Sequence, residues 1–304
     1  MRESDRKRTP NLEHVVDHVN SFDMSMIAAR RMGAEEGTPL LIASAVGANL
    51  EVWTRTLLDI ARARPIVTWD LRGLGDSGIA RSQRVDASAH AEDGVAVIDY
   101  YEVERFHLAG WSTGARIALE IAHRYPERVA SLTLVCGGYG YSVTSGLRHL
   151  EIASMLPLAS GVAKHFAGYL GGAFRGLMGR AELAGLIRQS GMVGPTADTA
   201  ALVDMVRSMG DSDTRTLLET YEAVAGRAAP ELLGQIEPST LLVAGERDPF
   251  TPRRIMKVME ERIPSASLTV YDKATHYLPI EFPARLASEM DSFMTENDKA
   301  GRFA

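Results

Sequence analysis

The sequence predicts an α/β fold in which a mostly parallel sheet of about eight strands is flanked by helices and carries an inserted helical cap. Short apolar runs alternate with longer helical patterns over most of the chain, which is typical of βαβ units. One central stretch lacks strand-like runs, which indicates an insertion. The length of 304 residues is about twice that of a common domain, yet α/β folds reach it around a single core.

Apolar runs rich in Val, Ile and Leu predict strands that are buried on both faces. These runs lie at 40–46, 65–69, 106–111, 129–136, 239–246 and 266–272. Helical patterns lie between or after them, at 50–63, 88–101, 113–125, 252–263 and 282–296. Because helices connect these strands, we expect the strands to be mostly parallel. Two earlier segments, 13–20 and 24–31, alternate in polarity as antiparallel strands would.

The stretch that interrupts the strand and helix alternation has helical patterns rich in Gly, Ala, Leu and Met. We therefore predict a core formed by residues 1–138 and 228–304 and a helical cap, or lid, formed by residues 139–227. Glycines in the cap weaken helices and permit bends, as expected of a segment that moves. Phe166 and Phe174, together with the few charges of this stretch, favour a moderately apolar ligand.

Composition and charge exclude several classes of protein. Hydrophobic residues make up 45% of the chain and charged residues 24%, as in an ordinary globular protein. The formal net charge of −6 lacks the basic excess that nucleic acids select, so we expect no nucleic acid partner. No apolar h-region follows the charged N-terminus, and no stretch approaches about eighteen uninterrupted apolar residues. We expect a cytoplasmic protein without a membrane span, and self-association into a homo-oligomer is left open.

The single cysteine, Cys136, forbids an internal disulfide and any zinc site built on several cysteines. It follows an apolar strand-like run and has no base paired with it in the sequence. We therefore interpret Cys136 as a buried small hydrophobe rather than as a second nucleophile.

The pentapeptide GWSTG at 110–114 follows a strand-like run and precedes a helical pattern. Its form, G-x-S-x-G, lets the chain turn sharply between the two and exposes the hydroxyl of Ser112 at the carboxyl edge of the sheet. The N-terminus of the following helix adds positive potential, and the N–H of Thr113 can face a developing oxyanion. The alternative is a serine that caps a helix behind a glycine turn, which the strand and helix on either side disfavour.

A serine hydroxyl becomes a good nucleophile when a base removes its proton and a third group orients that base. Asp248 lies in GERDPFTP after one predicted strand, and His276 lies in DKATHYLPIEFP after the next. Parallel strands place their carboxyl ends at one edge of the sheet, so both loops open at the edge that carries Ser112. The other histidines have no matching loop context. The chain order is Ser, Asp, His.

With these motifs the sequence resembles the α/β-hydrolase fold superfamily, and within it the cap-bearing serine esterases with a Ser-Asp-His triad. The resemblance covers about 35–138 and 236–296 and includes DLRGLGDSG at 70–78, a glycine-rich turn near the mouth of the site. It implies Ser112 as nucleophile, His276 as general acid and base, and Asp248 as the partner that orients the histidine. No acidic residue follows the strand that ends at Cys136, where some relatives carry the acid. Asp70, Arg72 and Asp76 are expected to hold the glycine-rich turn rather than to act in catalysis.

The region expected to bind the oxyanion departs from the pattern of the superfamily. Relatives usually carry His-Gly after the third strand, whereas the spacing to Trp53 places Ser44 and Ala45 there. Val46 then supplies the second N–H of the oxyanion hole. Because the donor is a main-chain group, the hole can survive, although losing the glycine restricts the local backbone. Gly47 is an alternative source of that flexibility, with the register shifted by one residue.

These residues predict acyl transfer to water without a metal or an organic cofactor. The first hypothesis is hydrolysis of a carboxylic ester of a moderately apolar small molecule through an acyl-enzyme. The second keeps the same triad but cleaves a carbon–carbon bond or transfers the acyl group to an acceptor other than water. The third is a ligand sensor without catalytic activity on a hydrolase scaffold, since a fold does not dictate a function.

Overall fold

The computed structural model describes residues 12–48, 50–140 and 181–301, and its described strands form one sheet of eight. The strands are β1 (Val15–Asn20), β2 (Met26–Gly33), β3 (Leu40–Ala43), β4 (Pro65–Trp69), β5 (Phe106–Trp111), β6 (Val129–Val135), β7 (Thr240–Gly245) and β8 (Ala266–Tyr271). Their order across the sheet is β1-β2-β4-β3-β5-β6-β7-β8. β2 is antiparallel to both β1 and β4, and every other pair is parallel. The predicted α/β fold with a mostly parallel sheet is confirmed.

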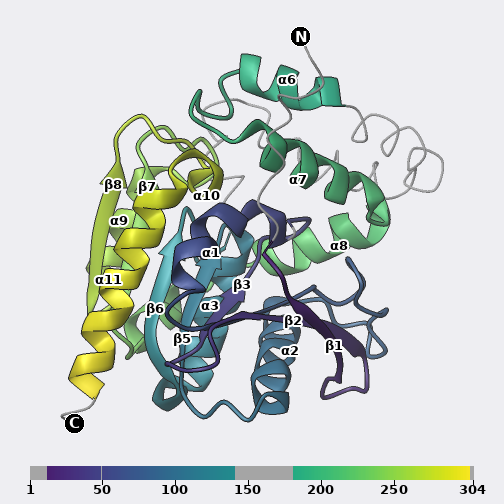
Figure 1. Ribbon diagram of the computed structural model, residues 1–304, viewed down its shortest axis with the longest axis vertical. Coiled ribbons are helices and arrows are strands. Elements are labelled where there is room, and N and C mark those ends of the chain that lie inside the picture. Colours follow the sequence, from purple (N-terminus) through teal and green to yellow (C-terminus); the bar gives the residue numbers. More distant parts are fainter. Residues whose placement is uncertain (1–11, 49, 141–180, 302–304) are drawn as a thin grey trace.

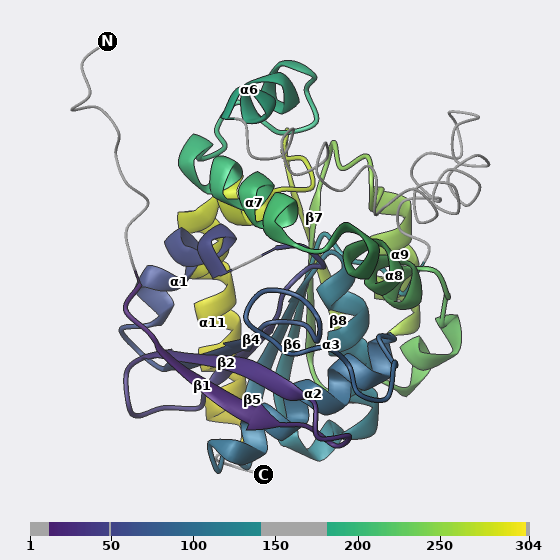
Figure 2. The ribbon, with the colours of Figure 1, turned by 90° about the vertical axis from the view of Figure 1, so that its right-hand side faces the viewer.

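Helices cover both faces of the sheet (Figure 1, Figure 2). α1 (Thr54–Ile60) and α11 (Pro283–Gly301) pack on one face, where they close one apolar cluster with the strands. α2 (Ala87–Tyr100), α3 (Thr113–Arg124) and α9 (Arg253–Arg262) close a second cluster on the other face. Shorter helical turns are η2 (Leu50–Val52), η3 (Pro126–Arg128), η5 (Pro230–Gln235) and α10 (Leu278–Glu281). The helices predicted from the sequence are all present, with ends shifted by a few residues.

Burial along the strands follows their place in the sheet. Every residue of β4, β5, β6 and β7 is buried, as the continuous apolar runs predict for strands covered on both faces. β1 lies at one edge and is mostly exposed, which fits its alternating sequence. The loops that carry Ser112 and Asp248 therefore follow fully buried strands, β5 and β7, whereas the loop that carries His276 follows β8, which is only partly buried.

The strand predicted at 40–46 ends earlier, at Ala43. Helix α3 begins close to this point, and a side chain in place of Gly114 would overlap the carbonyl oxygens of Ala43 and Ser44. The chain leaves the sheet there, and Gly47 takes a left-handed conformation with φ of 78°. The segment from Ser44 to Gly47 is thus a loop at the carboxyl edge of the sheet rather than the end of a strand.

Helices fill the described part of the insertion between β6 and β7. α6 (Ala181–Gln189), α7 (Thr199–Asp211) and α8 (Thr214–Ala225) lie on one side of the core (Figure 1), and Met209 and Leu217 from the last two approach Gly47. The helical character agrees with the predicted cap, whose boundaries at 139–227 stay a prediction. Phe166 and Phe174 lie outside the described residues. Within the described ranges, no helix is long and apolar enough to cross a membrane.

Candidate active site

Three side chains predicted from separate parts of the sequence meet at the carboxyl edge of the sheet. Ser112 lies between β5 and α3, Asp248 follows β7, and His276 follows β8. Nε2 of His276 is 2.8 Å from Oγ of Ser112, and Nδ1 of His276 is 2.8 Å from Oδ2 of Asp248. The three residues form one continuous chain of hydrogen bonds.

The backbone of Ser112 is held in a conformation that few residues adopt. Its φ of 55° and ψ of −120° are unfavourable for a residue with a Cβ and cost on the order of 1–3 kcal/mol. Gly110 and Gly114 make the turn feasible, because a Cβ at either position would overlap main-chain atoms of the elements packed against it. The N–H of Ser112 donates to the carbonyl of Val135 at 3.0 Å, which fixes the turn against β6. The half-buried hydroxyl is left facing His276.

The carboxylate of Asp248 is buried and fully hydrogen-bonded. Oδ1 accepts the N–H groups of Phe250 and Thr251, each at 2.8 Å, and Oδ2 bonds His276. A carboxylate oxygen accepts a hydrogen bond, so the contact with Oδ2 selects the tautomer of His276 that carries its proton on Nδ1. Nε2 then has a free lone pair directed at Ser112. This is the arrangement in which an imidazole can remove the proton of a serine hydroxyl.

The loop that carries His276 is held in place by groups on several elements. Nε1 of Trp111 donates to the carbonyl of His276 at 2.9 Å, and the ring of Phe250 meets the imidazole edge to face at 5.0 Å between centroids. Glu281, buried in α10, accepts the N–H of Thr275 at 2.8 Å and the N–H of Gly194 at 2.7 Å. Gly194 belongs to the insertion, so this carboxylate ties the insertion to the histidine loop.

Sequence reasoning missed Glu281. The available signal was an acidic residue inside the apolar run LPIEFP, where a buried carboxylate requires donors. One donor, Thr275, is only six positions away, but the sequence does not show that the other, Gly194, lies 87 positions away.

The two N–H groups expected to bind an oxyanion differ in their contacts. The N–H of Val46 donates to Oγ1 of Thr113 at 2.8 Å. The N–H of Thr113, at the first residue of α3, has no acceptor among the described residues. The pairing of Val46 with Thr113 brings the predicted residues together, while their role as oxyanion donors stays a prediction.

Comparison with known proteins identifies the family. The model of the alpha/beta hydrolase fold family matches residues 38–283, well over half of the chain. The chain belongs to the alpha/beta hydrolase fold family. It is 28% identical over 274 residues to 2-hydroxymuconate semialdehyde hydrolase of Pseudomonas sp. strain CF600, a match that covers 87% of this chain and 89% of that protein.

Two further relatives of this alpha/beta hydrolase carry other activities in their names. The esterase RhEst1 from Rhodococcus sp. ECU1013 has a crystal structure that matches with a TM-score of 0.70 and 25% identity, covering 92% of this chain and 98% of that one. The dihydrolipoyllysine-residue acetyltransferase component of the acetoin cleaving system of Pseudomonas putida is 35% identical over 113 residues. That match covers 37% of this chain, and the chain spans 30% of that longer protein.

Cys136 lies beside Asp248 and His276. It is fully buried, and burial together with the charge of Asp248 raises the pKa of its thiol well above the usual range. Its ligand atom and those of Asp248 and His276 lie within 4.8 Å of one another, a group that could hold a metal ion. Because the thiol stays protonated and the other two already bond each other, we assign no metal to this group. Its burial agrees with the predicted interpretation as a small hydrophobe.

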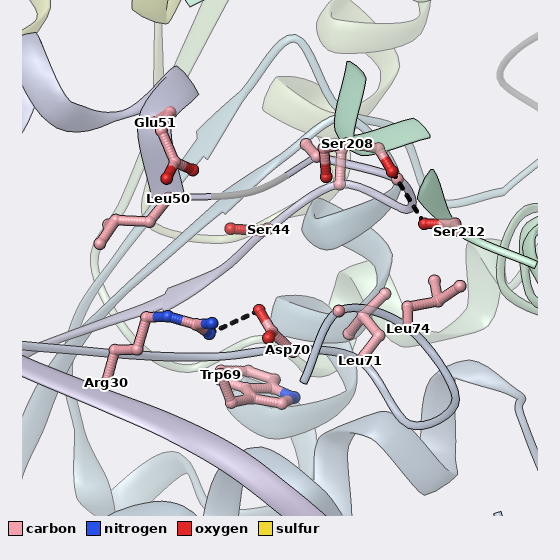
Figure 3. A pocket seen from close by; sticks show the side chains of 14 residues that line it. Arg30, Ser44, Leu50, Glu51, Trp69, Asp70, Leu71, Leu74, Ser208 and Ser212 are labelled. Carbon is pink, nitrogen blue, oxygen red and sulfur yellow. Dashed lines mark hydrogen bonds and ion pairs between the residues drawn. The ribbon is translucent and has the colours of Figure 1, made fainter. Parts of the chain in front are cut away.

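A cavity of about 190 Å³ lies behind the loop that contains Ser44 (Figure 3). Arg30 and Asp70 line it and form an ion pair at 2.7 Å between Nη1 and Oδ1. The carboxylate of Asp70 also accepts the N–H of Asp76 at 2.9 Å, and the carboxylate of Asp76 pairs with Arg30 at 2.6 Å, which agrees with the predicted role of both residues in holding the glycine-rich turn. Ser208 of α7 closes the cavity from the insertion, whereas Ser112 is not among its lining residues.

Proposed function

We propose that this alpha/beta hydrolase cleaves carboxylic esters with Ser112 as nucleophile, His276 as general acid and base, and Asp248 as the group that orients the histidine. The observation that carries the proposal is the unbroken chain of two 2.8 Å hydrogen bonds from Ser112 through His276 to Asp248. A serine hydroxyl needs such a base, and the base needs a partner that fixes its tautomer. The match to an esterase structure also supports an ester substrate.

The proposed reaction proceeds in two halves at Ser112. Nε2 of His276 takes the hydroxyl proton while Oγ attacks the carbonyl carbon, and the electron pair of the C=O bond moves to its oxygen. That pair re-forms the C=O bond as the alcohol leaves with the proton from His276. Water then attacks the acyl-enzyme and gives a proton to the same Nε2, which passes this proton to Oγ of Ser112 as the bond to the acyl group breaks and the acid leaves. The buried carboxylate of Asp248 stabilises the imidazolium that forms in each half.

We place the oxyanion at the N-terminus of α3, beside the N–H of Thr113 and the loop from Ser44 to Gly47. The helix N-terminus carries positive potential, and the N–H of Thr113, which has no acceptor among the described residues, can bond the oxyanion without breaking a hydrogen bond within the described protein. Near this loop, Met209 and Leu217 approach Gly47 from the insertion. Their apolar side chains support a moderately apolar substrate.

Turnover of p-nitrophenyl esters of increasing acyl length tests the proposal. We expect wild-type protein to release p-nitrophenol, with Ser112→Ala slower by about 10⁴-fold or more because no acyl-enzyme forms. Ser265→Ala, which removes an exposed hydroxyl on the loop before β8, is the matched control and should retain wild-type turnover. Equal turnover by wild type and Ser112→Ala would contradict the proposal, and no turnover by either would favour a ligand sensor.

A second candidate function uses the same three residues on a different bond or acceptor. The relatives named as a semialdehyde hydrolase and as an acetyltransferase component support it. Cleavage of an ester in the presence of a primary alcohol distinguishes acyl transfer, because the transferase forms the new ester whereas the hydrolase forms the acid. Carbon–carbon cleavage is tested with a vinylogous diketone, whose loss is followed by absorbance.

A further inference from the structure

The side chain of Thr113 uses its hydroxyl differently from three other buried threonines. Oγ1 of Thr113 accepts the N–H of Val46 at 2.8 Å, and the residue is 4% exposed. Thr56, Thr68 and Thr251 are also buried, but each donates its hydroxyl proton to a main-chain carbonyl at 3.0 to 3.1 Å. In the described ranges the hydroxyl proton of Thr113 has no acceptor.

The position of Thr113 explains the unused proton. A threonine inside a helix commonly donates its hydroxyl to the carbonyl four residues earlier. Thr113 is the first residue of α3, and the residue four positions before it, Ala109, belongs to β5. The hydroxyl therefore lacks the local acceptor that a position further along the helix would give it.

The bond from Val46 also limits where the proton can point. A hydroxyl has one proton and two lone pairs, so an oxygen that accepts an N–H directs its own proton elsewhere. The main-chain N–H of Thr113 likewise has no acceptor in the part of the chain that the structure describes. One residue next to Ser112 thus offers two donors, at a helix end whose dipole attracts negative charge.

We propose that the hydroxyl of Thr113 is itself an oxyanion donor, and that Val46 acts through it. In the tetrahedral intermediate the oxyanion accepts the N–H and the O–H of Thr113, and no proton is transferred. The N–H of Val46 holds and polarises the hydroxyl, since hydrogen bonds in series strengthen one another. Thr113 is then a catalytic residue and Val46 a positioning residue. This inference rests on the proposed function and replaces the direct contact that the sequence predicted for Val46.

Thr113→Val and Thr113→Ser form a matched pair that tests the hydroxyl. Valine keeps the branched shape and the main-chain N–H but has no O–H, whereas serine keeps the O–H. We expect Thr113→Val to lower kcat about 100-fold with KM nearly unchanged, as for loss of one oxyanion donor. Thr113→Ser should stay within about threefold of wild type. Active sites are counted with a fluorophosphonate, so that misfolded protein does not enter kcat.

A trifluoromethyl ketone supplies a second readout that a purely structural role would not move. Such a ketone adds to the serine and forms an anionic oxygen like that of the intermediate, so its Ki should rise about 100-fold in Thr113→Val and not in Thr113→Ser. Unchanged or higher kcat in Thr113→Val would overturn the inference. The hydroxyl of Thr113 would then only accept the N–H of Val46 and would not bind the oxyanion. Equal loss in both variants would overturn it as well. Wild-type protein without turnover would instead refute the proposed function.

Discussion

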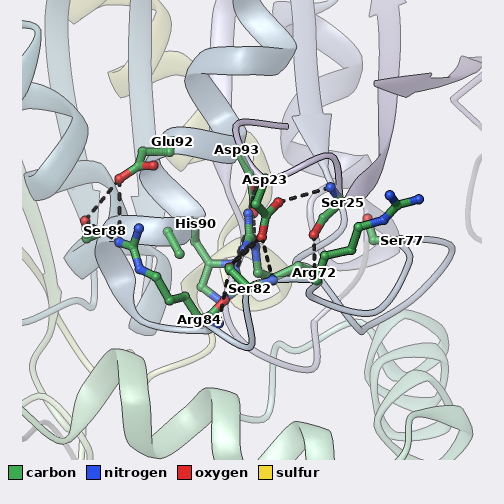
Figure 4. Close-up of polar contacts among 12 residues, drawn as sticks. Asp23, Ser25, Arg72, Ser77, Ser82, Arg84, Ser88, His90, Glu92 and Asp93 are labelled. Carbon is green, nitrogen blue, oxygen red and sulfur yellow. Dashed lines mark hydrogen bonds and ion pairs between the residues drawn. The ribbon is translucent and has the colours of Figure 1, made fainter. Parts of the chain in front are cut away.

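Two polar clusters of this hydrolase join distant parts of the chain, but one pairs charged side chains with each other whereas the other combines an imidazole with uncharged donors. In the first, Arg72 is fully buried and bonds Asp93 of α2 through Nε at 2.8 Å and Asp23 of the β1–β2 turn through Nη1 at 3.0 Å (Figure 4). Burial alone would lower the pKa of Arg72, but Asp93 and Asp23 raise it. The same pairing holds the pKa of Asp93 below its usual range, against burial. Every charge in this cluster has its partner.

The second cluster, around Ser112, contains groups that can form further hydrogen bonds or accept a proton. His276 has a lone pair directed at a hydroxyl proton, and Thr113 has an N–H and an O–H without described acceptors. A satisfied ionic cluster stabilises one arrangement of the fold, whereas unused donors and bases can bind groups that form during a reaction. The comparison predicts that substitutions in the cluster around Ser112 lower activity, whereas substitutions in the cluster around Arg72 lower stability.

The largest expected effect is on turnover in Asp248→Asn. The amide oxygen of asparagine can still accept the N–H groups of Phe250 and Thr251, but its NH₂ would donate to Nδ1 of His276. The imidazole proton then moves to Nε2, and no base faces Ser112. We expect kcat to fall about 10⁴-fold. The free energy of unfolding should change by less than about 1 kcal/mol. Ester turnover measures kcat, and urea denaturation measures the free energy of unfolding. Near-normal turnover would indicate that an acidic residue other than Asp248 orients His276.

Arg72→Met should have the opposite effect: it should lower folding stability and leave turnover nearly unchanged. Removing the guanidinium leaves Asp93 buried without its partner, which costs about 3–5 kcal/mol of folding stability. Turnover per fluorophosphonate-titrated site should stay within about threefold of wild type, because the cluster holds no reacting group. Arg62→Met is the matched control, since the Arg62–Asp59 pair is exposed and contributes about 0–1 kcal/mol. Loss of kcat without loss of stability in Arg72→Met would break the comparison.

A smaller effect is expected from pH at His107, a buried histidine of β5 outside both clusters. Burial lowers its pKa to about 4, although the charge of Asp298 opposes the shift. In the unfolded chain the value returns to about 6.5, so between these values the unfolded state binds a proton that the folded state does not. Stability should therefore be lost as pH falls from about 6.5 to about 4, by on the order of 2–3 kcal/mol.

Comparing His107→Gln with wild type isolates this contribution from that of the carboxylates. The variant should lose less stability than wild type over the same pH range, in urea denaturation at each pH. His14→Gln, which alters an exposed histidine, is the control and should follow wild type. Parallel curves for wild type and His107→Gln would show that His107 does not carry the dependence.

The fold, and the meeting of Ser112, Asp248 and His276 at one edge of the sheet, could be predicted from sequence because their signals are local. Apolar runs specify buried strands, glycines at 110 and 114 specify the sharp turn, and parallel strands bring their carboxyl-end loops to one edge. The early end of β3 at Ala43 was not predicted, because it depends on how closely α3 packs against that strand.

Contacts between distant side chains could not be predicted in the same way. The bond from Val46 to Oγ1 of Thr113 depends on a side-chain rotamer that no local pattern specifies. Arg72 was expected to hold its own turn, but its partners Asp93 and Asp23 lie 21 and 49 positions away. Such partners are fixed by tertiary packing, which the sequence pattern does not encode locally.

Mass spectrometry of the protein treated with a fluorophosphonate tests most directly whether the chain from Ser112 through His276 to Asp248 activates the serine. The reagent reacts with a serine whose proton a neighbouring base removes. We predict one adduct per chain, on the peptide that contains Ser112, and strongly slowed labelling in His276→Gln. Labelling at another serine, or equal labelling of Ser112 in wild type and His276→Gln, would contradict the account.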